Sequence, residues 1–222
     1  MNYTISTQLA QKVPDLELAC IECNVEVQAI NVQLWDEIQQ KTVELSAKLK
    51  IEDIKDLPAI SASRLAYKAC GKDPARYRLS AEALLRRVVN RNEIYQISNV
   101  VDLLNLVSIS TGFSIGGYDA DKIEGDIIYG IGKPNEPYTG IGRGELNIEG
   151  MPVFRDSVGA FGTPTSDSER TSVTLETKRF LMIIIDYAAS PQLAEATALA
   201  RELLVKYAQA TNFDIKNITN YP

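Results

Sequence analysis

Polar residues that could do chemistry concentrate between Arg76 and Asp126. Within this stretch, NVVDLLN places Asp102 and Asn105 in an otherwise apolar helix. Residues three apart lie on one helical face, and a buried Asp or Asn left without a hydrogen bond costs about 1 to 3 kcal/mol. We therefore expect these two side chains to brace a nearby loop, with the lining of a site as the alternative.

A second polar group begins at Gly116-Gly117-Tyr118-Asp119. Two glycines allow close backbone approach and expose amides. Carboxylates then follow at Asp119, Asp121, Glu124 and Asp126. This arrangement could receive an amino group or position a water molecule, and a tight capped turn fits the pattern equally well.

A third group lies in the polar loop from Thr163 to Thr171, just before a strongly apolar segment. Asp167, Ser168 and Arg170 offer an acceptor, a hydroxyl and a rigid guanidinium. Such a trio suits recognition of an α-amino acid or a phosphate. The alternative is a solvated loop.

The chain contains no histidine. This excludes Ser-His-Asp and Cys-His catalysis and every histidine-dependent metal site. Cys20 and Cys23 fall three apart on an expected strand, so they face opposite sides and cannot jointly hold a metal. The glycine-rich segments match neither Walker A nor a strand-flanked GxGxxG. We expect buried structural thiols, no metal and no cofactor.

Charge is distributed unevenly along the chain. The formal net charge is −6, yet residues 64–91 hold eight basic and two acidic side chains. That window is +6, which leaves −12 for the rest. A compact basic surface suits an anionic partner that docks in one orientation, whereas a solvated pair of helices is the alternative.

Hydrophobic periodicity and punctuation predict the order of elements. Expected elements are a strand within 16–30, helices over 31–50, 60–70, 81–90 and 100–110, short strands within 126–132, 137–142, 144–149 and 151–156, a central strand over 179–187 and a helix over 190–210. Helices in front, strands behind and a closing helix favour an α+β fold. No apolar run reaches the roughly 18 residues of a membrane span and no signal core is present, so we expect a cytoplasmic protein without a membrane partner.

Three motifs resemble the B3/4 domain of the bacterial phenylalanyl-tRNA synthetase beta chain, which edits mischarged tRNA. NVVDLLN is similar to the family's NVVDxTN, and SIGGYDADKIEGDI is similar to its PxHAFDxDK(I/L)xG. TSVTLETKRFLM resembles the stretch leading into the family's last core strand. Free-standing B3/4 proteins, with patterns such as YRxSAEALLRR and DSxRTxVTxET, are more similar still. The resemblance covers most of residues 16–187.

The resemblance implies a single α+β B3/4 domain with short-stranded mixed sheets and helices packed around them. We expect a strand-helix extension over 1–60, a core over 61–187 and a closing helix over 190–211. The synthetase's other modules have no counterpart here, so aminoacylation is not expected. The resemblance also implies a pocket for the aminoacyl end of a tRNA. It places the editing histidine on Gly116, the threonine on Leu104 and a glutamate near Ser172.

Two functions are compatible with these residues. The first is an editing-like domain that hydrolyses misacylated tRNA in trans, with Asp119 or Asp167 as the catalytic carboxylate. The second is a non-catalytic module that binds RNA or an amino acid. In either case tRNA, aminoacyl-tRNA or an amino acid is the expected partner and DNA is not. We expect tRNA at Arg86, Arg87 and Arg91, and the substrate at Arg78, Asn105, Gly116, Gly117, Glu124, Ser168 and Arg170.

Overall fold

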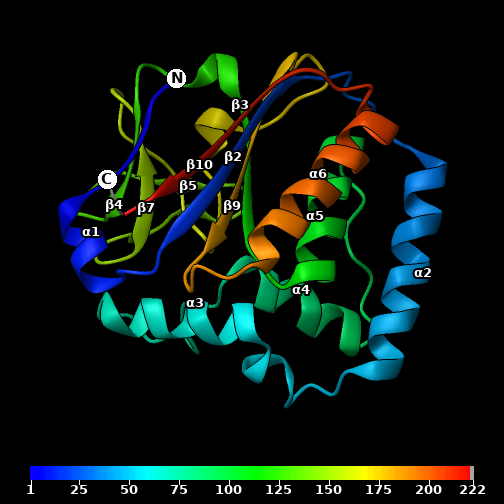
Figure 1. Cartoon of the computed structure of the whole chain (residues 1–222), viewed down its shortest axis with the longest axis horizontal. Coiled ribbons are helices and arrows are strands. Elements are labelled where there is room, and N and C mark those ends of the chain that lie inside the picture. Colours follow the sequence, from blue (N-terminus) through cyan, green and yellow to red (C-terminus); the bar gives the residue numbers. More distant parts are fainter. Residues whose placement is uncertain (221–222) are drawn as a thin grey trace.

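A four-stranded antiparallel sheet forms the centre of the molecule (Figure 1). The computed structural model describes residues 1–220. In spatial order this sheet contains β10 (Thr211–Thr219), β2 (Glu17–Asn24), β9 (Arg179–Asp186) and β3 (Ser114–Asp119). The sequence of β9, RFLMIIID, is almost continuously apolar because both faces of an interior strand are covered.

A second sheet packs against one face of the first. It contains β1 (Tyr3–Ile5), β4 (Ile127–Ile131), β7 (Pro152–Arg155) and β8 (Ala160–Gly162), with β1 parallel to β4 and the other pairs antiparallel. The short strands β5 (Thr139–Gly140) and β6 (Gly144–Glu145) form a separate hairpin. This combination of sheets and helices confirms the expected α+β fold.

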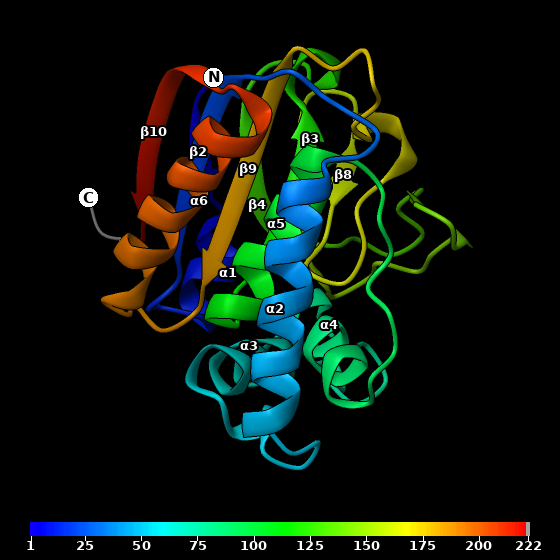
Figure 2. The same ribbon diagram turned by 90° about the vertical axis from the view of Figure 1, so that its right-hand side faces the viewer.

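Helices cover the other face of the first sheet and its lower end. Figure 2 shows α5 (Asn99–Thr111) and α6 (Gln192–Ala208) against the sheet, with α2 (Val32–Lys48) outside them. α3 (Pro58–Ala69) and α4 (Ser80–Val89) lie below, and α1 (Thr7–Lys12) lies beside the second sheet. Three single-turn helices complete the chain: η1 (Ile54–Asp56), η2 (Ala120–Lys122) and η3 (Glu169–Thr171).

The alternating faces of the central strands feed two separate apolar cores. In β2, Ile21 and Cys23 belong to the helical core, whereas Cys20 belongs to the core between the sheets. The two thiols of the CxxC pair thus point to opposite faces, as strand geometry requires. All three cysteines are buried and unpaired, and burial raises the pKa of Cys20 and of Cys23 to about 12.

Local signals explain most helix ends. The Asn31 side chain accepts a hydrogen bond from the Leu34 amide and caps α2. Gly112, with φ of +82°, ends α5 in the left-handed conformation that glycine adopts easily. The helix expected over 81–90 begins one residue earlier, at Ser80, and no side chain caps its start.

Four strands differ from the expectation. Gly116-Gly117-Tyr118-Asp119 forms the last four residues of the edge strand β3 and not a turn. β1, β8 and β10 have no predicted counterpart. β10 pairs with β2 and has a register shift between Thr211 and Asp214, and a bulge of this kind breaks the period of two that identifies a strand. The amino-terminal segment contributes β2 to the interior of the larger sheet.

Candidate functional site

The free edge of β3 faces the segment 163–171, and the two meet at Asp167. The Tyr118 hydroxyl donates a hydrogen bond to the Asp167 carboxylate at 2.9 Å. The Gly117 amide donates a longer one at 3.5 Å. Asp167 also bridges to Gly162 at the end of β8, so the carboxylate lies where the two sheets and this loop come together.

Two glycines hold the Tyr118 hydroxyl in place. A Cβ atom on Gly116 would overlap the hydroxyl oxygen, and so would a Cβ on Gly162. The Tyr118 ring is buried, with edge contacts to Phe154 and Phe161. Glycine is therefore required at both positions because the phenol occupies the space that a side chain would take. The position to which the resemblance assigns a histidine is filled by the hydroxyl of Tyr118.

The environment of Asp167 favours its protonated form. Burial raises the pKa of Asp167 to about 7, against the opposing effect of its hydrogen bonds from Tyr118 and Gly117. No ion pair to a lysine or arginine is present at this carboxylate among residues 1–220. Its two donors are neutral, so it lacks the charge compensation that usually keeps a buried carboxylate ionised.

Asp119 does not join this site. It follows Tyr118 along β3 and so points to the opposite face of the sheet. Its carboxylate accepts hydrogen bonds from the Thr177 hydroxyl at 2.8 Å and from the Asp121 amide at 3.2 Å. Lys122 lies 3.6 Å away. These contacts cap η2 and fix the loop before β9, so the two carboxylates expected to act in catalysis occupy separate environments.

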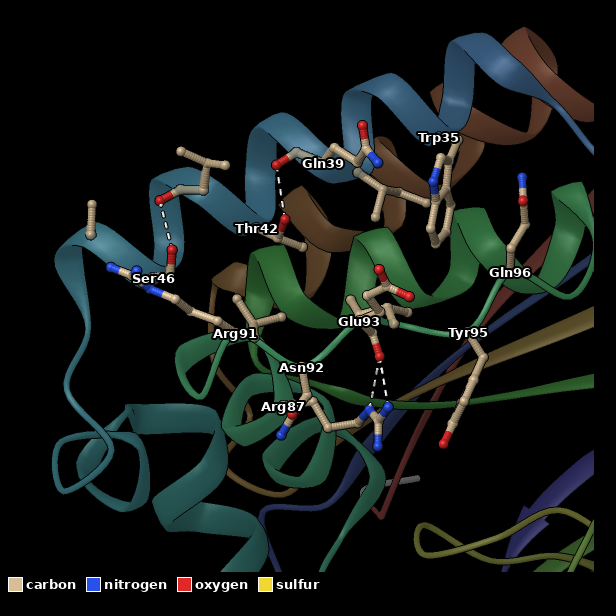
Figure 3. Close-up of a pocket in the computed structure, with 15 residues that line it drawn as sticks. Trp35, Gln39, Thr42, Ser46, Arg87, Arg91, Asn92, Glu93, Tyr95 and Gln96 are labelled. Carbon is tan, nitrogen blue, oxygen red and sulfur yellow. Dashed lines mark hydrogen bonds between the residues drawn. The ribbon is translucent and has the colours of Figure 1, made fainter.

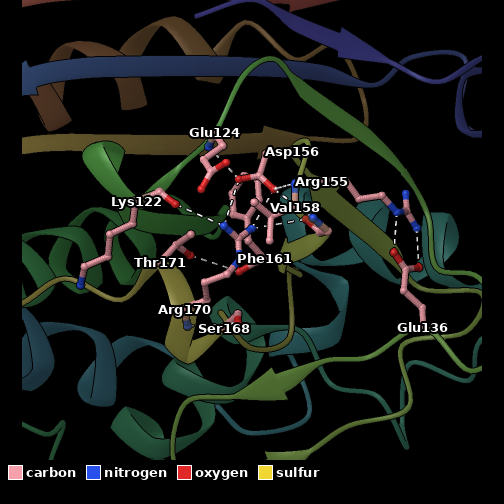
Figure 4. A network of polar contacts seen from close by, with 11 residues as sticks. Lys122, Glu124, Glu136, Arg155, Asp156, Val158, Phe161, Ser168, Arg170 and Thr171 are labelled. Atoms are coloured by element: carbon pink, nitrogen blue, oxygen red, sulfur yellow. Dashed lines mark hydrogen bonds and ion pairs between the residues drawn. The ribbon is translucent and has the colours of Figure 1, made fainter.

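The Arg170 guanidinium forms an ion pair with Asp156 (Figure 4). It donates two hydrogen bonds to this carboxylate, at 2.9 and 3.0 Å, and further ones to the carbonyls of Lys122 and Gly159. Burial opposes ionisation of Asp156, but its hydrogen bonds from Arg170 and from nearby amides prevail and lower the pKa. This pair locks together the loops that flank the second sheet.

Other residues expected to bind substrate have modest roles. The Ser168 hydroxyl accepts from the Arg170 amide and caps η3. Glu124 is exposed and uses its amide to contact Asp156. Asn105 is half-buried on α5, and Gly117 gives room to Leu104 on that helix.

The Asp102 carboxylate accepts a hydrogen bond from the Ile97 amide at 2.9 Å and braces the loop before α5. Burial raises the pKa of Asp102 to about 6.

Glu82 organises much of the basic segment. Its buried carboxylate accepts hydrogen bonds from Arg64 and Arg86, with closest distances of 2.8 and 2.9 Å, and Arg78 lies 3.7 Å away. Arg78 and Arg86 are thus both partners of an internal carboxylate. The cluster still carries a net charge of +2, and Lys68 and Arg76 in the same segment are exposed.

The other two residues expected to bind tRNA, Arg87 and Arg91, lie away from the Glu82 cluster. They line a hollow between α2 and the segment 91–96 (Figure 3). Its volume is about 1120 Å³, and both Arg87 and Arg91 line it. Arg87 packs over Tyr95, whereas the Arg91 side chain extends toward α2. Five of the eight basic residues of the window therefore divide between the Glu82 cluster and this groove.

The fold agrees with a comparison against protein families. A model of the B3/4 domain matches residues 62–207, and the chain belongs to the B3/4 domain family. Among solved structures, an N-terminal fragment of the phenylalanyl-tRNA synthetase beta-subunit from Pyrococcus horikoshii is similar, with a TM-score of 0.46 and 15% identity. The match covers 98% of this chain and 50% of that one, so this chain spans about half of its length. No curated protein matches.

Sequence patterns missed several residues that organise these regions. Glu82 had a signal, because arginines four residues before and after it place three charged groups on one helical face. Tyr118, Gly162 and Asp156 had none, since their partners are distant in the chain. Within residues 1–220, no helix combines the length and apolar character needed to cross a bilayer.

Proposed function

We propose that this protein is a non-catalytic RNA-binding module of the B3/4 family, with tRNA or aminoacyl-tRNA as its partner. The observation that carries the proposal is the position of the Tyr118 hydroxyl between Gly116 and Gly162. The phenol fills the space beside Gly116, where the resemblance implies an editing histidine. Arg170 and Asp119 are also held by internal partners, which leaves few groups to act on an ester.

The charge distribution supports an RNA partner. After pairing with Glu82, the segment 64–91 still carries +6 on a chain with a net charge of −6. Lys68 and Arg76 are exposed, and cations of this kind bind phosphates by displacing the condensed counterions of the nucleic acid. An acidic body with one basic surface favours binding in a single orientation.

Binding of deacylated tRNA at several salt concentrations tests this proposal. We expect affinity to fall steeply as salt rises, and Lys68→Ala or Arg76→Ala to reduce the slope of log K against log salt by about 1 each. Arg143→Ala, which removes an exposed charge from the β5–β6 hairpin, serves as the matched control. Salt-independent binding, or equal slopes for all three variants, would count against the basic surface.

One observation favours hydrolysis as a second candidate. A carboxyl with a pKa of about 7, such as Asp167, is well suited to general base catalysis near neutral pH. Asp167 would take a proton from a water molecule whose oxygen attacks the ester carbonyl. The bond from the carbonyl carbon to the ribose oxygen would then break, and that oxygen would take up a proton, which releases amino acid and tRNA.

A deacylation assay across mischarged tRNAs separates the two candidates. Turnover above the buffer rate that disappears in Asp167→Asn would establish the hydrolase. Binding of the same tRNAs without turnover supports the non-catalytic module. A thermal-shift screen with free amino acids distinguishes binding of the aminoacyl group alone, since free amino acids should then raise the melting temperature in the absence of RNA.

A further inference from the structure

A groove lies outside the Tyr118–Asp167 site, between α2 and the segment 91–96. Trp35, Gln39, Thr42 and Ser46 line it from α2, as Figure 3 shows. The end of α4 and the following segment supply the opposite wall. With about 1120 Å³, the groove is large enough for a ligand of several hundred daltons.

Arg87 and Tyr95 form a rigid stack at one end of this groove. The guanidinium carbon lies 4.4 Å from the centroid of the Tyr95 ring. The Nε and Nη2 atoms of Arg87 both donate to the Glu93 carbonyl, at 3.2 and 2.7 Å, and these bonds fix the plane of the group. Tyr95 is nevertheless 68% exposed, so the stack presents a flat, cationic π surface to solvent. Unstacked bases bind to such aromatic and guanidinium planes.

Arg91 supplies a free positive charge at the other end. It is exposed, and no hydrogen bond or ion pair to its side chain is found among residues 1–220. In Figure 3 its side chain extends toward Ser46 on α2. Its backbone, with φ of +57°, ends α4 in the left-handed region and turns the chain into the segment that carries Tyr95. Arg91 can therefore contact a phosphate without first breaking an internal pair.

The charge of the groove differs from that of its neighbour. Arg87, Arg91 and Glu93 give the groove a charge of +1. The neighbouring hollow along α2 is lined by Asp36 and Glu44 and by no basic residue, and Lys41 and Lys48 pair with Glu44. An anionic ligand is thus favoured in the groove over its neighbour.

We propose that this groove binds a short unpaired stretch of RNA, with a base stacked on the Arg87–Tyr95 pair and a phosphate held by Arg91. The inference rests on the proposed RNA-binding function and adds a second, single-strand-specific contact to the basic surface of α3 and α4.

Trp35 makes the groove directly observable, because it is the only tryptophan in the chain. We would titrate the full protein with a single-stranded RNA hexamer of mixed sequence and follow tryptophan fluorescence. A saturable change is expected with the hexamer, and a much weaker response with the same sequence as a duplex. Tyr95→Ala should weaken binding about tenfold, since stacking of one base has roughly that effect, while Tyr95→Phe should retain the affinity.

Charge variants complete the test. Arg91→Ala should weaken hexamer binding and reduce its salt slope by about 1, whereas Arg143→Ala should leave both unchanged. Equal affinity for duplex and single strand, or hexamer binding that Tyr95→Ala leaves intact, would overturn the inference. A fluorescence change with an acidic peptide but not with the hexamer would assign the groove to a protein partner and also overturn it.

Binding of whole tRNA separates this inference from the function on which it rests. If tRNA binds with a salt slope that depends on Lys68 and Arg76, but the hexamer leaves Trp35 fluorescence unchanged, the groove assignment fails and the RNA-binding function stands. If the hexamer binds in the groove and tRNA does not bind at all, the groove assignment stands and tRNA is the wrong partner.

Discussion

Two carboxylates in this molecule are withdrawn from solvent in opposite ways. Glu82 is buried with arginines from α3, from α4 and from the loop before α4 around it. Asp167 has only the Tyr118 hydroxyl and the Gly117 amide. An arginine cluster makes a carboxylate a structural anchor, whereas the neutral donors at Asp167 leave it able to accept a proton. The comparison shows that charged partners, more than burial, distinguish a structural carboxylate such as Glu82 from one that can exchange a proton, such as Asp167.

The sharpest way to break this comparison is to remove the anchor. Glu82→Ala leaves up to three guanidinium groups without their shared acceptor, and we expect a loss of about 3 kcal/mol in the free energy of unfolding, measured by urea denaturation. Glu44→Ala is the matched control, because its ion pairs with Lys41 and Lys48 are exposed and surface pairs contribute little. If both variants lose the same small amount, Glu82 is not an anchor.

The next largest effect is expected where Tyr118 is held. Gly116→Ala displaces the Tyr118 ring, and we expect this overpacking to lower the free energy of unfolding by about 2 kcal/mol. Gly162→Ala should cost a similar amount. Because either variant displaces the same ring, the double variant should cost less than the sum of the two. Gly130→Ala is the control, since a Cβ there meets nothing closer than 3.1 Å. Full additivity would show that the two glycines do not share a constraint.

Proton binding at Asp167 gives a prediction with a definite sign. Its pKa is about 7 in the folded state and about 3.9 in an unfolded chain, so the native state binds more protons between these values. The contribution of Asp167 to stability should therefore fall as pH rises from about 4 to 7, and its full penalty should remain above pH 7. Asp167→Asn should remove this dependence and exceed the wild type above pH 7 by about 1 to 3 kcal/mol.

Parallel denaturation of wild type and Asp167→Asn at pH 5 and pH 8 checks this sign. Asp102, with a pKa of about 6, and Asp156, with a lowered pKa, titrate in both proteins, so the difference between wild type and variant isolates Asp167. A variant that is less stable than the wild type at pH 8 would mean that the surroundings of Asp167 favour its ionised form, which would contradict the prediction.

The smallest expected effect concerns Arg91. Its left-handed backbone is costly for any residue with a Cβ, so Arg91→Gly should raise stability slightly, by about 0.5 kcal/mol. The same change removes the free charge from the groove. A variant that folds at least as well as wild type and binds RNA less tightly would place the loss in the groove, whereas unchanged binding would confine RNA to the surface of α3 and α4.

The predictability of this fold depends on how local its signals are. Asn31 and Gly112 mark helix ends through contacts within a few residues, so α2 and α5 could be placed from the sequence alone. β9 is recognisable because an interior strand is apolar throughout. β3 is not, since Gly116 and Gly117 are typical of turns, and their meaning depends on Tyr118 and Leu104 packing above and below them.

The site was less predictable than the fold for a related reason. Asp167 and Arg170 lie three residues apart in one loop, but their partners, Tyr118 and Asp156, come from different parts of the structure. Residue type indicates which hydrogen bonds a side chain can make. It does not indicate which of them are already used internally, and that distinction determines what remains for a ligand.

The position of β2 between β9 and β10 also has a consequence for how this protein is made. Asn24 pairs with Arg179, and Glu17 pairs with Thr219, so the central sheet joins segments from opposite ends of the described chain. Contacts of such long range raise contact order and slow folding. During synthesis β2 leaves the ribosome long before β9 and β10 have been made. Until then its backbone hydrogen-bonding groups and its two cysteines, which are buried in the folded protein, are exposed. We therefore expect the nascent chain to depend on chaperones until β9 and β10 have emerged.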